Sequence, residues 1–368
     1  MKKIVIIIFF AILLTPALDR KLHFLPVYEE TEKRDLSPRP NYSLPLNLAK
    51  TMKDFESYWN DHFGGRSLMV NKRAQLWTKI FRDSPEKSVV IGQDGWLFYK
   101  SESKDDGPGI NDIEGLVPLS EVEIGKVIGS INKVKDDLSA KGITLVVTVA
   151  PNKSTIYKEY LPFNFPIIAN GNTRLDQLVK AMPEDINFVD LRSTLIDGKN
   201  TMPTYQKTDS HWNNYGAYVA SMEIIKKLSK DYGMQPVPLD QYDIETKAVT
   251  GEGDLASMMA ARSIFSEEYI GIKPKKSMVY TDYDYGYEKG LYSGHIWKQT
   301  NKKLPRLLMF GDSYRTSMTP FLILYFSESY IMGFSKNYKI NYELVNLSKP
   351  NVVIWEVAER YIDRFVQK

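Results

Sequence analysis

An unbroken apolar run that ends in a short polar motif constrains the fold of this chain most. Positions 307–310 read Leu-Leu-Met-Phe without alternation of polar and apolar residues, and Gly-Asp-Ser follows at 311–313. A strand buried on both faces of a parallel sheet has this pattern. Because open α/β folds bind ligands beyond the carboxyl ends of such strands, Ser313 is a candidate nucleophile. The motif is also compatible with a plain strand-to-helix turn in which Asp312 or Ser313 caps the next helix.

Similar runs recur along the chain with helix-length spacers between them. Predicted strands lie at 143–149, 187–191, 304–310, 330–334 and 352–357, and predicted helices include 120–140 and 173–181. Strands with helical crossovers predict a parallel, right-handed α/β sheet flanked by helices. Residues 251–300, rich in Tyr and Gly, break this rhythm, and we expect them to form a β-rich insertion on the upper edge of the sheet, as a lid or part of a substrate groove.

The chain before the sheet divides into three predicted parts. Lys2 and Lys3 precede an apolar run, so residues 1–18 are predicted to be a signal peptide or an uncleaved signal anchor, with a buried N-terminal element as the alternative. Residues 19–45 carry charges and prolines and are predicted to be a linker. The remainder, 46–368, is the predicted main domain, and its extension 46–119 contains helices near 47–63 and 67–81 and a hairpin at 88–99. The protein is therefore expected outside the cytoplasm, secreted or anchored to the membrane.

Composition excludes several classes of protein. The chain has 368 residues, of which 43% are hydrophobic and 25% charged, and this balance is typical of a globular protein. A net charge of +3 without a basic block argues against a nucleic-acid partner. The absence of cysteine excludes thiol nucleophiles and thiolate metal sites.

A second motif, at 208–212, supplies a candidate base. It reads Thr-Asp-Ser-His-Trp and precedes a helical pattern that starts near 214. Asp209 can hold one imidazole nitrogen of His211 so that the other nitrogen accepts a serine proton. The alternative is a helix N-cap, with Asp209 or Ser210 capping and His211 packing beside Trp212.

These motifs together resemble a known family. The order Asp-x-His-Trp (209–212) and Gly-Asp-Ser-Tyr (311–314), after Asn-Asp-His-Phe-Gly-Gly-Arg (60–66), Asp-Gly-Trp-Leu-Phe (94–98) and Pro-Asn-Lys (151–153), resembles the AlgX/AlgJ-type proteins, which are similar to SGNH hydrolases, and the related DHHW family. The resemblance covers about residue 46 to the end. It implies an exported protein that O-acetylates an extracellular polysaccharide with acetyl groups supplied by a membrane-bound O-acyltransferase partner. Ser210 stands where the DHHW motif has histidine, which puts the subfamily and substrate in question.

The resemblance implies a triad of Ser313 as nucleophile, His211 as base and Asp209 as its orienter. Developing negative charge needs positioned donors, and the backbone N–H of Ser313 is the first candidate. Asn152, Lys153, Tyr314, Arg315 and Arg360 are further candidates for contact with the oxyanion or the substrate. Ordinary capping or solvation is the alternative for each, and Glu359 with Arg360 also reads as a surface pair on the final helix.

No cofactor is expected, and no metal site is expected either, because His62, His211 and His295 lack metal-binding spacing. His62 is instead predicted to fix the junction between its helix and the Gly64-Gly65 turn.

The sequence thus predicts a serine O-acetyltransferase, with a carbohydrate O-acetylesterase or a non-catalytic polysaccharide-binding scaffold as alternatives. If the N-terminal segment is uncleaved, it is the predicted contact with the membrane.

Overall fold

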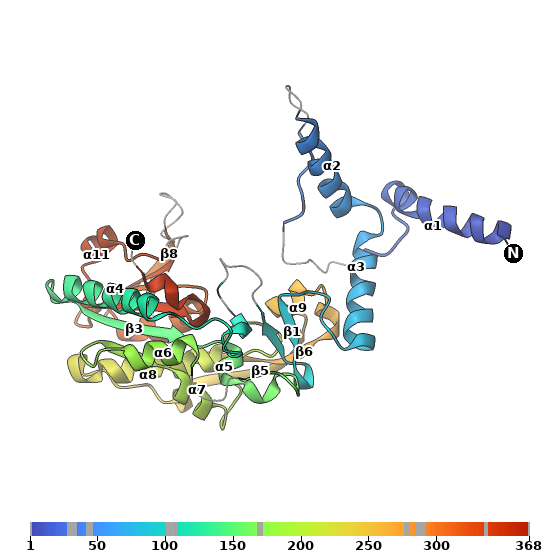
Figure 1. Cartoon of the computed structure of the whole chain (residues 1–368). Coiled ribbons are helices and arrows are strands. Elements are labelled where there is room, and N and C mark those ends of the chain that lie inside the picture. The colour runs from blue at the N-terminus through green and yellow to red at the C-terminus, as the bar shows by residue number, and fades with distance from the viewer. Residues whose placement is uncertain are drawn as a thin grey trace.

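A mostly parallel sheet lies at the centre of the computed structural model, which describes residues 2–27, 35–41, 47–100, 107, 109–167, 172–275, 280–284, 292–334 and 338–366 (Figure 1). Among these residues, the largest sheet has the order β4-β3-β11-β9-β10-β8-β7. Its strands are β3 (Thr144–Ala150), β4 (Asn187–Asp190), β7 (Tyr280–Asp284), β8 (Tyr292–Gln299), β9 (Arg306–Gly311), β10 (Glu328–Phe334) and β11 (Val352–Ala358). The run from β4 to β10 is parallel, as predicted, and β8 and β7 add an antiparallel edge.

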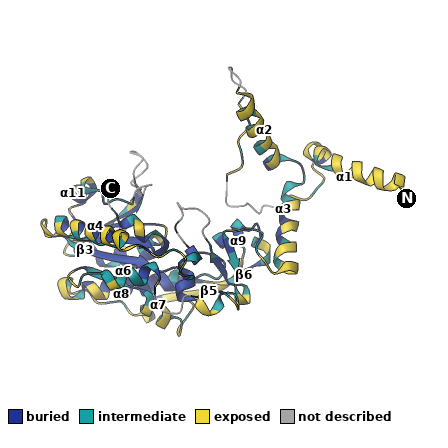
Figure 2. Cartoon of the chain, in the orientation of Figure 1, coloured by how far each residue is buried: buried dark blue, intermediate teal, exposed yellow. Residues whose placement is uncertain are grey.

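Successive residues of the central strands face two separate cores, because side chains alternate across a sheet. Leu307 and Met309 of β9 pack on one side with α8 (Asn214–Tyr232) and α10 (Arg315–Leu322). Leu308 and Phe310 pack on the other side with α4 (Glu121–Ser139), α6 (Arg174–Ala181) and α11 (Tyr342–Ser348). The absence of alternation at 307–310 therefore reflects burial on both faces, which Figure 2 shows as dark central strands under helices with exposed outer surfaces.

Local sequence signals set where the helices begin. Ser120 caps α4 and exchanges hydrogen bonds with Glu123, and Thr173 does the same with Asp176 at α6. The Asn213 side chain caps α8. Each such cap stabilises a helix by about 1 kcal/mol. The remaining elements of this part are η3 (Gly109–Asn111), α5 (Lys153–Ile156), η4 (Lys158–Tyr160), α7 (Arg192–Gly198), η5 (Leu239–Gln241), η7 (Ile323–Tyr325) and η8 (Glu359–Phe365).

The segment predicted as an insertion divides into two structures. β5 (Tyr242–Thr250) begins before residue 251 and pairs antiparallel with β6 (Ser266–Pro274), with α9 (Asp254–Met258) and η6 (Arg262–Ile264) between them. β7 and β8 instead extend the main sheet beside β10. β7 and β8 therefore do not form part of an insertion on the upper edge of the sheet, because the free edge of β10 offers backbone groups that β8 pairs, and β8 in turn pairs β7.

The N-terminal extension contains helices and a small hairpin. Its elements are α1 (Lys2–Leu22), α2 (Leu48–His62), α3 (Arg66–Gln75), η1 (Leu76–Phe81), β1 (Val89–Ile91), η2 (Gln93–Gly95) and β2 (Leu97–Tyr99). The two helices and the hairpin lie where the sequence predicts them. His62 lies at the end of α2, where its Nδ1 is 2.9 Å from the Tyr58 carbonyl oxygen.

The boundary predicted at residue 18 falls inside a helix, since α1 continues to Leu22. Asp19 is buried and accepts a hydrogen bond from the Leu25 amide at 2.7 Å. The described part of the predicted linker is also held, because Ser37 donates two hydrogen bonds to Asp61. Positions 28–34 and 42–45 of that linker lie outside the described residues. Within the described ranges, no helix combines the length and apolar character that crossing a membrane requires.

Candidate active site

The candidate nucleophile lies at the carboxyl end of β9. Ser313 is exposed in the turn between β9 and α10, and we call residues 311–315 the nucleophile turn. Gly311 is needed here for close packing, since a Cβ at this position would lie 2.5 Å from Oε2 of Glu356. Its φ is not positive, so close packing and not a left-handed backbone explains the glycine at this position.

Two buried carboxyl groups, Asp312 and Glu356, fix the nucleophile turn through hydrogen bonds to backbone amides. Asp312 Oδ2 accepts a hydrogen bond from the Ala358 amide at 2.6 Å, and its Oδ1 accepts one from the Tyr314 amide at 3.1 Å. The Asp312 amide donates to Glu356 Oε2 at 3.0 Å. Burial, followed by the nearby charge of Asp312, raises the pKa of Glu356 well above its usual value. The turn is thereby tied to the end of β11, so the Ser313 backbone has a fixed position.

Two distant segments meet at Ser313. Its Oγ lies 2.7 Å from Nε2 of His211, and Nδ1 of His211 lies 2.6 Å from Oδ1 of Asp209. With the Nδ1 proton directed at the carboxylate, Nε2 is the acceptor for the serine hydroxyl. The three residues that the sequence singles out therefore form one hydrogen-bonded chain, although 102 positions separate His211 from Ser313.

Asp209 is set up to stay ionised. Its Oδ1 also accepts from the His211 amide at 2.9 Å, and its Oδ2 accepts from the Asp254 amide at 2.8 Å. Burial alone would raise its pKa, but the His211 ring and these amide donors outweigh burial and leave the pKa of Asp209 below its usual range. A carboxylate held this way orients the imidazole and stabilises its protonated form.

A second carboxylate near His211 was not singled out from the sequence. Asp254, at the start of α9, has Oδ2 at 3.8 Å from His211 Nδ1. Its two oxygens accept hydrogen bonds from the Ser210 amide at 2.7 Å and the Ser210 hydroxyl at 2.8 Å. Asp254 lies 43 positions from His211 in a Gly-Asp pair without a motif, so only the fold reveals it.

Lys153 was predicted to contact the oxyanion or the substrate, but its side chain binds the backbone of the segment before His211. The ammonium group donates to the backbone oxygens of Gln206, Lys207 and Asp209 at 3.0, 3.1 and 2.6 Å. An ammonium has three donors, so none remains for an oxyanion. Burial lowers the pKa of Lys153 to about 8 despite the opposing attraction of Asp209, Asp254 and Glu267. Lys153 therefore positions the segment 205–212, which we call the base loop.

Other elements hold the base loop from its far side. Glu267 of β6 accepts hydrogen bonds from the Lys207 amide and from the amide and hydroxyl of Thr208. The Thr208 carbonyl oxygen accepts from two amides of α9 at 3.2 Å each. A Cβ at Gly253 would lie 2.1 Å from that oxygen, so glycine is required for this approach. The β5–β6 unit thus supports the base loop, a role that the predicted lid or substrate groove did not include.

Tyr314 and Arg315 donate hydrogen bonds to backbone carbonyl oxygens near the site. The Tyr314 hydroxyl donates to the Ser210 carbonyl oxygen at 2.8 Å, and the Tyr314 carbonyl oxygen accepts from the Trp212 indole at 3.2 Å. Arg315 donates to the carbonyl oxygens of Gly311 and Asp312 at 3.4 and 2.5 Å. Tyr314 therefore joins the nucleophile turn to the base loop, and its hydroxyl is already bonded.

Glu359 and Arg360 are buried, so the interpretation as a surface pair was wrong. Glu359 Oε2 accepts from the Asn152 amide and the Thr155 hydroxyl, each at 2.7 Å. Burial, with the nearby charge of Asp112, raises the pKa of Glu359 to about 8. The Arg360 guanidinium lies 5.6 Å from the ring centres of Tyr99 and Tyr314, so it packs under the site through cation–π contacts.

Asn152 remains a candidate oxyanion donor. It lies two residues after the end of β3, is buried, and its side chain does not cap α5. The backbone N–H of Asn152 donates a hydrogen bond to Glu359, which places Asn152 beside the end of β11. The same end of β11 holds Asp312.

One group of ligand-type side chains in the described ranges brings its atoms within 4.8 Å of one another, namely Asp209, His211 and Asp254. The hydrogen bonds above account for every member of this group. It therefore carries no argument for a metal ion.

The chain combines a mostly parallel α/β sheet with a Ser-His-Asp arrangement at the carboxyl end of a central strand, as several classes of α/β hydrolase do. The family model for the SGNH hydrolase-like domain of the acetyltransferase AlgX matches residues 89–294, and this chain belongs to that family. The matched range contains Asp209, His211 and Asp254 and ends before Ser313.

Relatives support the same family. The chain is 26% identical over 224 residues to the probable alginate O-acetylase AlgJ of Pseudomonas aeruginosa, which covers 61% of this chain and 54% of the relative. The AlgJ protein of Azotobacter vinelandii gives 26% over 226 residues, with the same coverage. The chain thus spans about half the length of these curated relatives.

Two solved structures share the fold. A Bacillus cereus PatB1 structure with a sulfonyl adduct has a TM-score of 0.57 at 17% identity and covers 76% of this chain and 97% of that one. A DHHW family protein from Eubacterium siraeum has a TM-score of 0.54 at 17% identity and covers 76% of this chain and 92% of that one.

Proposed function

We propose that this chain is an exported, serine-dependent O-acetyltransferase that acts on a cell-surface or extracellular polysaccharide through an acyl-enzyme. The observation that carries the proposal is the continuous chain from Asp209 through His211 to Ser313, with contacts of 2.6 and 2.7 Å. An exposed serine hydroxyl bonded to an oriented imidazole is the arrangement that activates a nucleophile. Membership of the AlgX acetyltransferase family supports acetyl as the group transferred.

In the first step, Ser313 Oγ forms a bond to the acetyl carbon while His211 Nε2 takes its proton. His211 then gives this proton to the leaving oxygen of the donor, which departs and leaves acetyl-Ser313. A sugar hydroxyl next loses its proton to His211 and attacks the carbonyl carbon of the acetyl group. The bond from that carbon to Ser313 Oγ then breaks, and His211 returns the proton to Oγ. The Ser313 amide and the Asn152 side chain are the proposed donors to the negative oxygen of each tetrahedral intermediate.

The proposed donor is an acetyl group supplied by a membrane-bound O-acyltransferase partner, and the proposed acceptor is a polysaccharide. The AlgJ relatives are called probable alginate O-acetylases, so alginate oligosaccharide is the first acceptor to test.

The test is to incubate the full chain with 4-nitrophenyl acetate, with and without alginate oligosaccharide. We expect mass spectrometry to find an acetyl group on the Ser313 peptide and on the oligosaccharide. Ser313→Ala should lose both, whereas Ser317→Ala, a matched change in α10, should keep both. Acetate release at one rate regardless of acceptor, with an unmodified oligosaccharide, would identify an esterase. Full activity of Ser313→Ala in this assay would reject Ser313 as the nucleophile. A Ser313→Ala chain that still supports full polymer acetylation in cells would instead favour a non-catalytic scaffold.

A further inference from the structure

Helix α3 and its π-helical continuation η1 expose a row of apolar side chains. The exposed residues are Met69, Leu76, Trp77, Ile80 and Phe81. Ile80 and Phe81 are 68% and 58% exposed, and the rings of Trp77 and Phe81 lie 5.2 Å apart. Figure 2 shows the turns of this helix exposed beside the β5–β6 unit. Large apolar groups gathered on an outer surface are typical of an interaction site.

The opposite side of the same helix is docked. Asn71 and Ala74 are each 1% exposed, and Ala74 packs in a small core with Val89, Leu97 and Leu255. The helix is therefore fixed against the hairpin and α9, and its apolar row points away from them. Within the described residues, these apolar side chains stay exposed, so a partner outside them would have to cover the row.

The charge of this helix indicates what that occupant is. Residues 66–82 contain five basic residues and no acidic residue, namely Arg66, Lys72, Arg73, Lys79 and Arg82. Lys72 and Lys79 are exposed beside the apolar row. A helix with Trp and Phe on one face and cations along its sides is the pattern of a helix that lies in the interface of an anionic membrane.

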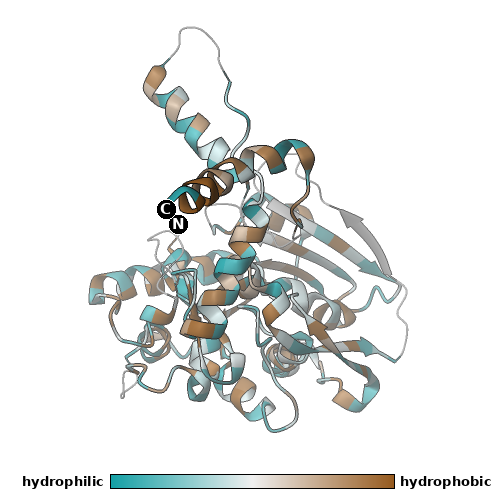
Figure 3. Ribbon diagram, turned by 90° about the vertical axis from the view of Figure 1, so that its right-hand side faces the viewer, coloured by the Kyte–Doolittle hydropathy of each residue, from teal (hydrophilic) through white to brown (hydrophobic). Residues whose placement is uncertain are grey.

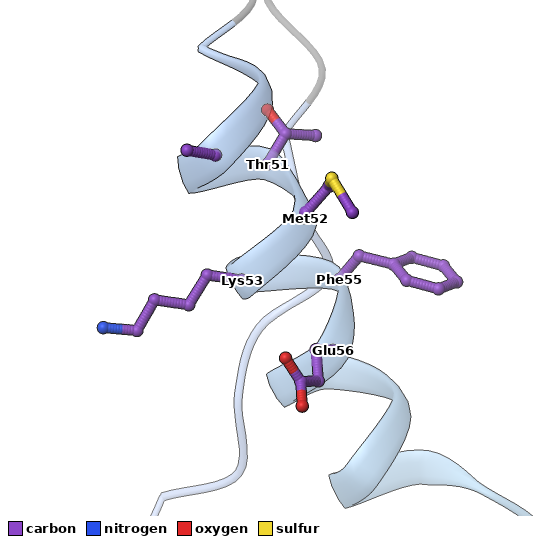
Figure 4. Close-up of a pocket in the computed structure, with 6 residues that line it drawn as sticks. Thr51, Met52, Lys53, Phe55 and Glu56 are labelled. Atoms are coloured by element: carbon purple, nitrogen blue, oxygen red, sulfur yellow. The ribbon is translucent and has the colours of Figure 1, made fainter.

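Two other helices of the N-terminal extension also expose apolar side chains. α1 approaches the start of α3 so closely that a Cβ at Gly64 would lie 2.3 Å from the Pro16 carbonyl oxygen. From Ile4 to Leu14 every residue of α1 is apolar and exposed, and Figure 3 shows this helix as the brown segment at the N-terminus. On α2, a pocket of about 610 Å³ includes Met52 and Phe55, which extend from one side of the helix (Figure 4).

We propose that α3 and η1 form a membrane-surface site for anionic phospholipid, with Trp77, Ile80 and Phe81 in the headgroup region and Lys72 and Lys79 on the phosphates. This contact is separate from the N-terminal segment. The β1–β2 hairpin and α9 pack on the buried side of the helix through Ala74. Because α9 carries Asp254 beside His211, the membrane contact orients the candidate active site relative to the membrane.

The test uses the full chain in a background that removes insertion of α1, Ile6→Glu with Phe10→Glu, both at exposed positions. Sedimentation would measure binding to vesicles of phosphatidylglycerol and phosphatidylcholine in about equal parts, and to phosphatidylcholine alone. We expect binding only to the anionic vesicles. Lys72→Gln with Lys79→Gln should weaken it about 25-fold, since each surface lysine contributes about fivefold. Lys226→Gln with Lys227→Gln on α8 is the matched control and should change little.

A local probe separates this helix from the rest of the chain. The chain has no cysteine, so Ile80→Cys accepts a single environment-sensitive dye, and Lys226→Cys on α8 serves as its control. We expect the dye at 80 to shift to the blue on anionic vesicles and the dye at 226 to remain unchanged. An unshifted dye at 80 would overturn the proposal. So would a shift that requires a reconstituted membrane protein, because the face would then bind protein.

Discussion

The nucleophile turn and the base loop reach the same site by different means. Consecutive residues form the nucleophile turn, which the main sheet holds through Asp312, Glu356 and the Ala358 amide. The base loop is held by Lys153 and by residues of α9 and β6, which are far apart in the sequence. Sheet pairing fixes the first side, whereas the second side depends on tertiary hydrogen bonds. We therefore expect the base loop to be more sensitive to the loss of one support.

The largest expected effect comes from breaking the contact between the two sides. His211→Ala should lower kcat for acetyl ester cleavage about 10⁴-fold, because no group then accepts the Ser313 proton. Steady-state kinetics with 4-nitrophenyl acetate would measure this. His62→Ala on α2 is the control and should keep its activity. A small loss in His211→Ala would mean that the 2.7 Å contact has no catalytic role.

The supports of the two sides can be compared directly. Lys153→Met removes the donor to three carbonyl oxygens of the base loop and should lower kcat about 100-fold through misplacement of His211. Arg315→Met removes two such bonds on the nucleophile side and should cost about tenfold or less, since β9 still holds Ser313. Thermal unfolding of both variants would show whether they fold. Equal losses in the two variants would contradict the difference between the sides.

A smaller effect tests the second carboxylate. Asp254→Asn keeps the shape near the Ser210 bonds but removes the charge 3.8 Å from His211 Nδ1, so kcat/KM should fall about tenfold. Ser210→Ala removes the hydroxyl between them and serves as the partner in a double-mutant cycle. If the free-energy losses of the two single variants add up to the loss of the double variant, Asp254 acts on His211 independently of the Ser210 hydroxyl.

The smallest effect concerns stability below the site. Glu359 has its pKa raised to about 8, so between about pH 4.5 and 8 the folded protein keeps a proton that the unfolded chain releases. The free energy of unfolding therefore falls as pH rises across this window, by about 1.4 kcal/mol per pH unit from this group. Glu359→Gln should flatten the slope, as measured by urea unfolding from pH 5 to 8. Glu121→Gln, at an exposed position of α4, is the control and should leave the slope unchanged. An unchanged slope in Glu359→Gln would reject the raised pKa of Glu359.

The strands of the parallel sheet, most helices and the hairpin could be predicted because each depends on a local pattern. The apolar run of β9 and the Ser120 cap of α4 are examples. The places of β7 and β8 could not be predicted, since joining a sheet edge depends on which partner is free in space. Burial of Glu359 and Arg360 was missed for a similar reason, because charged residues are ordinarily exposed.

The sequence by itself determined which side chains carry the proposed chemistry, since Ser313, His211 and Asp209 stand in short motifs at the ends of predicted elements. Only the tertiary structure decided their supports. Lys153 lies under the base loop, Asp254 beside the imidazole and Glu356 under the nucleophile turn. The physical reason is that a motif needs only neighbouring residues, whereas a buried charge takes whichever partner the fold brings within hydrogen-bond distance.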